Sequence, residues 1–146
     1  MTCVLRVKWL NTGNRNHSAD KKATAPLELV HSDLAGPVSP ASIEGCKYSI
    51  VFVDDYSGAT FLYFLRNKSD ATKATAKFLA DMTPYGCVKC LRTDQGTEYT
   101  CREFQDLMMK NKIAHEMSAP YSAHQNGTAE RAWRSLFEMG RLAALA

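Results

Sequence analysis

The sequence lacks the features that mark an exported or membrane-spanning chain. Its 146 residues contain no run of eighteen apolar residues and no basic stretch followed by an apolar leader. We therefore expect a soluble chain that is not secreted. The five cysteines show no paired or regular spacing. An odd number of cysteines without an export signal indicates reduced thiols rather than a disulfide framework.

Net positive charge is confined to the first segment of the chain. The whole chain has a formal net charge of +3, but residues 1–25 hold five Lys or Arg against one Asp, so they carry +4 and residues 26–146 carry −1. A basic leading segment suits a polyanion such as nucleic acid, although short basic tails are common. Residues 11–26 are polar and contain Gly13 and Pro26, which predicts a linker, and we expect order to begin near Leu27.

The rest of the chain alternates strand-like and helix-like segments. Period-2 patterns or β-branched and aromatic runs predict strands over residues 27–34, 47–53, 59–65, 87–94 and 113–119. The second and third of these flank a DDYSG turn, which is typical of a hairpin. Helical spacing links Ala71, Ala74, Phe78 and Met82, with Ser69 or Asp70 as the cap.

A second predicted helix has Phe104, Leu107 and Met108 on one face, and a third follows Asn126. No segment is repeated, and 45% hydrophobic residues in a chain of this length suit one domain with a real core. The order of the elements predicts an α/β fold, with a mixed sheet covered by helices.

Glu130 lies near the start of the last predicted helix. On a helical wheel that turns about 100° per residue, it falls at the margin of an apolar stripe that includes Trp133, in line with Arg134 and Arg141. An i,i+4 pair with Arg134 on a solvated face would explain Glu130 and contribute a few tenths of a kcal/mol.

Two upstream carboxylates favour a second interpretation. Asp94 ends an apolar strand before a Gln95-Gly96 turn, where open α/β sheets bind ligands; capping of that turn is the alternative. Asp33 lies within a strand on the face of Leu27 and Leu29, where an unpaired carboxylate would cost several kcal/mol.

Carboxylates from a strand, a strand end and a helix could meet at one edge of a sheet. Oxygen ligands of this kind bind Mg²⁺ or Mn²⁺. Two such ions about 4 Å apart can stabilise the entering and leaving oxygens of an in-line phosphoryl transfer.

Five segments that include these acids resemble, in order, the catalytic core of integrases from copia-type LTR retrotransposons. They are "LELVHSDLAGP", "VDDYSGATFLYFL", "LRTDQGTEY", "REFQ" and "APYSAHQNGTAERAWRSLFEMGR". The resemblance covers Pro26 to Arg141. Thirty-five residues separate Asp94 from Glu130, which is the spacing of the D-D-E signature of that family.

The resemblance implies an RNase H-like fold with a five-stranded mixed sheet flanked by helices. It also implies that Asp33, Asp94 and Glu130 are the catalytic, metal-binding residues, holding two Mg²⁺ or Mn²⁺ ions when DNA is bound. The implied activity is DNA integration, in which retrotransposon DNA is trimmed at its 3′ end and joined to target DNA. The implied partners are those DNAs and further copies of the chain, in the nucleus as part of an integration complex and otherwise in the cytoplasm.

Further residues can be assigned to DNA binding through the same resemblance. The QNG turn matches the loop that meets DNA in the family, although Asn126 would also make a good helix N-cap. The arginines are plausible phosphate contacts, although a solvated helix face would look the same. Tyr121 could stack on a base or pack in the core. The predicted DNA-binding residues are Tyr121, His124, Gln125, Asn126, Arg131, Arg134 and Arg141.

Other polar groups are predicted to be structural. Asp54 and Asp55 are neighbours on a strand, so they point to opposite faces and cannot chelate one ion together. The same geometry separates Cys87 from Cys90, and no second Cys or His pair accompanies them, so we expect no zinc site there. His31 is predicted to be a packed histidine rather than a ligand.

The chain departs from the family pattern at both ends. Residues 1–25 resemble the linker after an N-terminal zinc module, with Cys3 at the place of its last ligand; the other three ligands are missing, so no structural zinc is expected. Residues 26–146 correspond to the catalytic core and stop sixteen residues after Glu130, whereas the family core continues with further helices.

We therefore expect a truncated retrotransposon copy, an integrase-type polynucleotidyl transferase or endonuclease that keeps its triad but is weakened by truncation. A non-catalytic nucleic-acid-binding remnant is the first alternative. A nuclease for RNA–DNA hybrids is the second, against which the Asp94 to Glu130 spacing and the QNGTAER segment argue.

Overall fold

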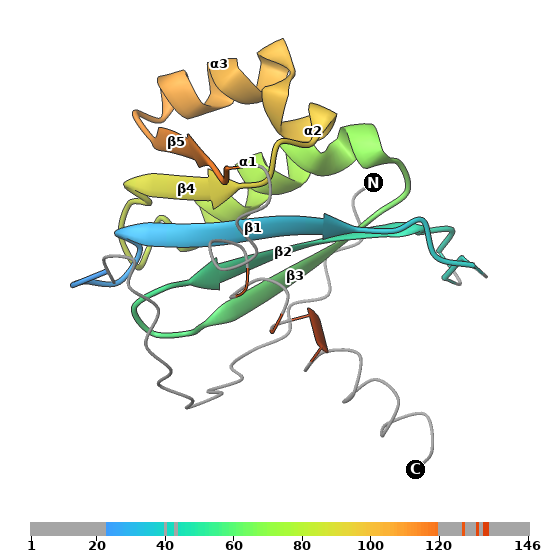
Figure 1. The fold of residues 1–146 in the computed structure, drawn as a ribbon, viewed down its shortest axis with the longest axis horizontal. Coiled ribbons are helices and arrows are strands. Elements are labelled where there is room, and N and C mark those ends of the chain that lie inside the picture. Colours follow the sequence, from blue (N-terminus) through green and yellow to red (C-terminus); the bar gives the residue numbers. More distant parts are fainter. Residues whose placement is uncertain are drawn as a thin grey trace.

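A single mixed sheet of five strands forms the centre of the molecule. The structure is a computed structural model, and it describes residues 23–39, 41–42 and 44–119, together with Gly127, Arg131, Trp133 and Arg134. The strands lie in the order β3-β2-β1-β4-β5 (Figure 1). Their bounds are β1 Leu29–Ala35, β2 Tyr48–Asp54, β3 Thr60–Leu65, β4 Cys90–Thr93 and β5 Ala114–Met117.

The strand directions confirm the predicted mixed sheet. β2 pairs antiparallel with both β1 and β3, so the hairpin expected on either side of the DDYSG turn is present. β4 pairs with β1 and β5 pairs with β4, both in parallel. β4 is shorter than predicted. It begins at Cys90, so Cys87 lies before the strand.

Helices α1, Ala71–Met82, and α3, Arg102–Lys110, match the two helices predicted in this part of the chain. A short 3₁₀ turn, η1 Lys68–Asp70, precedes α1, and a one-turn helix, α2 Thr97–Thr100, precedes α3; neither was predicted. Asp70 occupies the N-cap of α1 as expected, but its side chain makes no capping hydrogen bond. Its carboxylate instead accepts from the main-chain N–H of Asn67 at 3.1 Å.

The main core lies between these helices and one face of the sheet, as their common side in Figure 1 indicates. Phe78 of α1 stacks on Phe52 of β2 with ring centroids 4.2 Å apart. Phe104 of α3 meets Tyr99 of α2 edge to face at 5.3 Å. These aromatic contacts fix the helices on the sheet and supply much of the apolar area removed from water.

The opposite face of the sheet carries a smaller apolar cluster. Val51, Val53 and Leu62 are buried there, and Trp133 packs against them. Asp33 belongs to this face, and the prediction that Leu27 shares it is wrong. Leu27 precedes β1 with a φ of +61°, which breaks the strand alternation, and its side chain joins the main core on the helix side.

The cysteines and the helices of the described residues show two further features. The described cysteines, Cys46, Cys87, Cys90 and Cys101, are free thiols. Across the ranges given above, none of the helices has the length and apolar character needed to cross a membrane.

Candidate active site

Asp33, within β1, and Asp94, directly after β4, lie level with each other on neighbouring strands. The parallel ladder pairs Leu29 with Cys90 and continues in step to His31 and Arg92. Two residues further along the same register come Asp33 in β1 and Asp94, the first residue after β4. Residues level with each other in a parallel pair point to the same face. The pairing therefore brings together two acids that are 61 positions apart in the sequence.

Each of these carboxylates has one oxygen fixed by the main chain. Asp33 Oδ1 accepts from the N–H of Leu34 at 2.9 Å, and Asp94 Oδ1 accepts from the N–H of Gly96 at 2.9 Å. The turn-capping alternative for Asp94 is thus present in the structure. It occupies one oxygen only, and Asp94 Oδ2 accepts no hydrogen bond from the described residues. Both side chains are half-buried rather than fully enclosed, so solvent and ligands can reach them.

A buried tyrosine lies beneath the two aspartates. Tyr99 is fully buried, and its hydroxyl is 3.2 Å from the hydroxyl of Ser32. Burial raises the pKa of Tyr99 well above its usual value, and the negative charges of Asp33, Asp94 and Glu98 raise it further. The phenol therefore stays protonated and neutral beside these acids.

Glu98 is another acid near the pair, and no pattern in the sequence singles it out. Its side chain is only 5% exposed, and its Oε2 lies 3.1 Å from Lys68 Nζ. A Cβ atom at Gly96 would meet this carboxylate, so the Glu98 side chain would have to shift to admit one. In a sequence, an acid in the first turn of a helix indicates only a favourable interaction with the helix dipole. The burial of Glu98 and its ion pair with Lys68 could therefore not be predicted.

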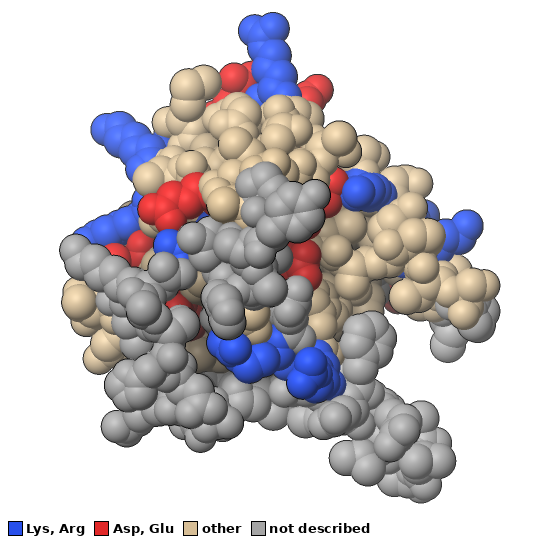
Figure 2. All heavy atoms as spheres, in the orientation of Figure 1, with Lys and Arg blue, Asp and Glu red and all other residues tan. Residues whose placement is uncertain are grey.

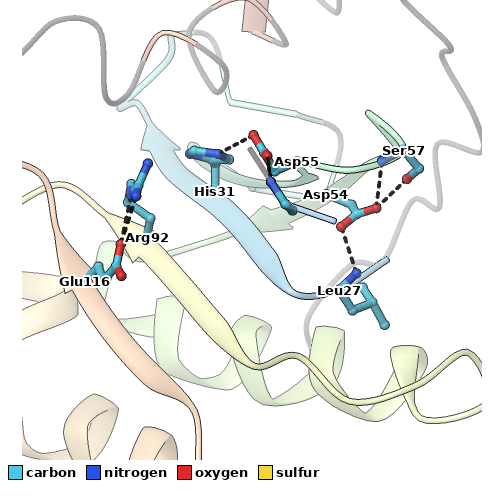
Figure 3. Close-up of polar contacts among 8 residues, drawn as sticks. Leu27, His31, Asp54, Asp55, Ser57, Arg92 and Glu116 are labelled. Carbon is cyan, nitrogen blue, oxygen red and sulfur yellow. Dashed lines mark hydrogen bonds and ion pairs between the residues drawn. The ribbon is translucent and has the colours of Figure 1, made fainter. Parts of the chain in front are cut away.

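His31 in β1 and Arg92 in β4, two residues before the aspartates, each form an ion pair, and Figure 3 shows both pairs. His31 is 3% exposed with Nε2 3.1 Å from Asp55 Oδ1. On the adjacent strand, Arg92 Nη2 lies 2.9 Å from Glu116 Oε2. His31 is thus buried and bonded to a protein carboxylate, as expected for a packed histidine.

Asp54 and Asp55 bind different groups of the protein, in keeping with the structural role predicted for both (Figure 3). Asp54 is 3% exposed, and its carboxylate accepts from the main-chain N–H groups of Leu27 and Ser57 at 2.9 and 3.0 Å. Asp55 accepts from the N–H of Ala23 at 2.8 Å as well as pairing with His31. Both acids therefore hold the segment before β1 against the hairpin turn.

Many of the remaining predicted site residues lie outside the described residues. These are Cys3, Tyr121, His124, Gln125, Asn126, Glu130 and Arg141. Arg131 and Arg134 are described and exposed, while Trp133 between them is half-buried on the Asp33 face of the sheet. In the view of Figure 2, acidic and basic side chains are interspersed over the coloured surface rather than gathered by sign.

The chemistry of the paired aspartates suits a hard divalent cation, because both offer carboxylate oxygens. Within the described ranges, no three His, Cys, Asp or Glu side chains are grouped so that they could hold a metal ion. Asp33 and Asp94 would therefore supply two carboxylates, and a complete site would need a further ligand.

Comparison with known proteins identifies the family. The family model described as "Integrase core domain" matches residues 23–123 of this chain. The chain is 38% identical over 117 residues to the Retrovirus-related Pol polyprotein from transposon TNT 1-94 of Nicotiana tabacum, which covers 79% of this chain and 9% of that relative. It is 31% identical over 121 residues to the corresponding polyprotein from transposon RE2 of Arabidopsis thaliana, covering 81% of this chain and 8% of the relative.

A viral relative and a solved structure extend the comparison. The chain is 35% identical over 108 residues to the Pro-Pol polyprotein of feline foamy virus, covering 74% of this chain and 9% of that relative. It therefore spans less than a tenth of the length of these relatives. A chain in the cryo-EM structure of the simian T-cell lymphotropic virus intasome in complex with PP2A regulatory subunit B56 gamma matches 84% of this chain and 44% of its own length.

That structural match has a TM-score of 0.64 at 20% sequence identity, so it bears on the fold alone. It confirms the expected RNase H-like architecture, a mixed five-stranded sheet with flanking helices. Since the family model covers more than half of the sequence and several relatives exceed 30% identity, the chain belongs to the integrase core domain family.

Proposed function

We propose that this chain is the catalytic core of a copia-type retrotransposon integrase and that Asp33, Asp94 and Glu130 bind Mg²⁺ or Mn²⁺. The observation that supports the proposal is the parallel register of β1 and β4, which pairs His31 with Arg92. Continued for two residues, this register sets Asp33 and Asp94 level and on the same face. A half-buried pair of carboxylates costs free energy through mutual repulsion, and a divalent cation offsets that cost.

The residues around the pair would prepare it for a cation. The N–H groups of Leu34 and Gly96 orient one oxygen of each carboxylate. The buried phenol of Tyr99 keeps its proton, so it adds no further negative charge to the site. Two divalent cations, when bound, would polarise the scissile phosphate and stabilise the entering and leaving oxygens of phosphoryl transfer.

DNA would approach the face of the sheet opposite α1, α2 and α3. Arg131 and Arg134 are exposed residues of the segment whose Trp133 packs on that face, and guanidinium groups suit phosphate contacts. The proposed substrates are the ends of retrotransposon DNA and a target duplex. We also propose that the chain assembles with further copies of itself, as the family resemblance implies, and that it acts in the nucleus, where a target duplex is available.

Metal-dependent nicking of a supercoiled plasmid tests this function. The wild-type chain should nick DNA with Mn²⁺ and not with a chelator, and Asp94→Asn should reduce the rate to the chelator level because one metal ligand is lost. Asp106→Asn is the matched control, since Asp106 is an exposed acid on α3 with only a loose i,i+4 contact to Arg102.

Three other outcomes would contradict the proposal. DNA binding without nicking in the wild type would favour the non-catalytic remnant. Nicking that survives Asp94→Asn would place the activity elsewhere or in a contaminant. Faster cleavage of an RNA–DNA hybrid than of duplex DNA would favour the hybrid nuclease.

A further inference from the structure

A buried hydroxyl residue directly precedes each of the two aspartates. Ser32 precedes Asp33 and Thr93 precedes Asp94, and both hydroxyl residues are fully buried. Because successive side chains of a strand point to opposite faces, these hydroxyls point toward the helices while the carboxylates point to the other face. Groups on the helix side of the sheet can therefore hydrogen-bond to the residues next to the two acids.

The hydroxyl of Thr93 takes part in a chain of hydrogen bonds from α3 to the main chain at Asp94. Thr93 Oγ1 lies 2.8 Å from the carbonyl oxygen of Asp94 and 2.9 Å from His115 Nε2 on β5. His115 Nδ1 lies 3.0 Å from Gln105 Nε2 on α3. The same Gln105 nitrogen lies 2.8 Å from the carbonyl oxygen of Tyr99.

The chemistry of these groups fixes the direction of every hydrogen bond. A carbonyl oxygen only accepts, so the group of Gln105 that faces Tyr99 must be its NH₂, and its second hydrogen goes to His115 Nδ1. His115 Nδ1 must then accept, which leaves the proton on Nε2 to be donated to Thr93 Oγ1. Thr93 in turn donates to the carbonyl of Asp94. Burial lowers the pKa of His115, in keeping with the neutral ring that this order requires.

Hydrogen bonds hold the peptide groups on both sides of Asp94. The carbonyl oxygen of Thr93 accepts from the N–H of Ser118 at 2.8 Å and from the hydroxyl of Ser118 at 2.9 Å. The carbonyl oxygen of Asp94 accepts from Thr93 Oγ1. With the peptides on both sides of its Cα fixed, the direction of the Cα–Cβ bond of Asp94 is fixed as well, and the N–H of Gly96 then holds one oxygen of the carboxylate.

We propose that Gln105, His115 and Thr93 are positioning residues that set the Asp94 carboxylate in the orientation needed to bind the cation. Tyr99 extends the network to the second acid, since Gln105 holds its carbonyl and its hydroxyl meets Ser32, the residue before Asp33. The proposal rests on the proposed function, because the benefit of a fixed carboxylate is metal affinity. Groups that orient metal ligands typically change affinity by about 10- to 100-fold when they are removed.

The decisive variant is Thr93→Val, which keeps the shape of the side chain and removes its hydroxyl. Thr93→Ser restores the hydroxyl and is the conservative rescue. Thr75→Val is the matched control, because Thr75 is equally buried and its hydroxyl also donates to a carbonyl, that of Ala71 at 2.8 Å, within α1. Mn²⁺ affinity is measured by calorimetry on the full chain, and thermal melting is recorded for each variant.

We expect Thr93→Val to weaken Mn²⁺ binding about tenfold or more, Thr93→Ser to bind nearly as the wild type, and Thr75→Val to bind as the wild type even if it melts as early as Thr93→Val. Wild-type affinity in Thr93→Val, or an equal loss in Thr75→Val, would overturn the positioning role. A wild-type chain that binds no Mn²⁺ would instead contradict the proposed function.

A second measurement decides the positioning role without metal. The N–H of Gly96 donates to Asp94 Oδ1, so its hydrogen exchange reports on the orientation of that carboxylate. Loss of the Thr93 hydroxyl should speed this exchange roughly fivefold, the equivalent of one ordinary hydrogen bond, and Thr75→Val should leave it unchanged. Unchanged exchange in Thr93→Val would overturn the proposal whatever the metal result.

Discussion

At the scale of single residues, hydrogen-bond partners distinguish four aspartates that look alike in the sequence. Both oxygens of Asp54 accept main-chain N–H groups, and Asp55 binds His31 and the N–H of Ala23. Asp33 and Asp94 instead each have an oxygen held by an N–H one or two residues ahead. Asp54 and Asp55 therefore anchor neighbouring segments of the chain. Asp33 and Asp94 are half-buried, so solvent can reach them.

The protonation of His115 should make the free energy of unfolding depend on pH. Burial lowers its pKa below the ordinary 6.5, so its contribution to stability is fully present above pH 6.5, where the ring is neutral in both states. As the pH falls below 6.5, the unfolded chain takes up the proton first, and the contribution is lost as the pH passes the folded pKa. The contacts that the structure gives for His115 are with the uncharged Thr93, Gln105 and Phe104.

Urea unfolding at pH 7.5 and pH 5 checks this expectation. The wild type should lose more of its free energy of unfolding between these values than His115→Gln, which has no group that titrates in this range. Equal losses in the two proteins would mean that His115 is not held neutral by its surroundings.

At the scale of elements, local patterns predicted most of the strands and helices. The β2–β3 hairpin and α1 follow from alternation and helical spacing over short windows. Helix α2 was missed because one turn is too short to show a period. The face of Leu27 was misassigned because its positive φ, held by a hydrogen bond from its N–H to Asp54, has no local sequence signal.

Only part of the candidate site could be predicted, because contacts between distant segments leave no local signal in the sequence. Acids in or after apolar strands stand out in a sequence, so Asp33 and Asp94 could be found. The register that sets them level depends on long-range pairing of β1 with β4. The roles of Gln105 and His115 could not be predicted, because their partners come from elements that meet only in the folded chain.

The end of β1 gives a prediction at the scale of elements. Gly36 has a φ of +127°, and a Cβ atom there would lie 2.6 Å from the carbonyl oxygen of Lys47 and 2.9 Å from a ring carbon of Tyr48. Gly36→Ala should therefore lower the free energy of unfolding by roughly 2–4 kcal/mol, from strain and a clash with main chain together.

Gly45→Ala is the matched control for this substitution. Gly45 also has a positive φ, +78°, but nothing lies within 4 Å of its Cβ position, so its loss should stay near 1–2 kcal/mol, roughly the cost of the backbone strain alone. Equal losses measured by urea unfolding would show that β1 does not approach β2 as closely as the structure indicates.

At the scale of the whole molecule, the two faces of the sheet have different roles. Helices α1 to α3 cover one face and form the main core, and the aspartate pair faces the other. The DNA site is therefore expected on the side of Arg134 and not on the side of α3, although both carry exposed arginines.

A comparison of those arginines tests this separation. Arg134→Ala should weaken duplex DNA binding for all sequences alike and reduce the slope of log affinity against log salt by about 1, because one phosphate contact is lost. Arg102→Ala on α3, where the side chain is 92% exposed, should leave both quantities unchanged. The same effect from both variants would indicate nonspecific attraction by net charge.

The proposed function depends on a set of carboxylates that the fold brings together to bind metal. The most direct test is calorimetric titration of the full chain with Mn²⁺, comparing the wild type with Asp94→Asn, Glu130→Gln and the control Asp106→Asn. We expect saturable binding in the wild type and the control, and weaker binding in both of the other variants. Absence of binding in the wild type, or binding that ignores both substitutions, would contradict the proposed function.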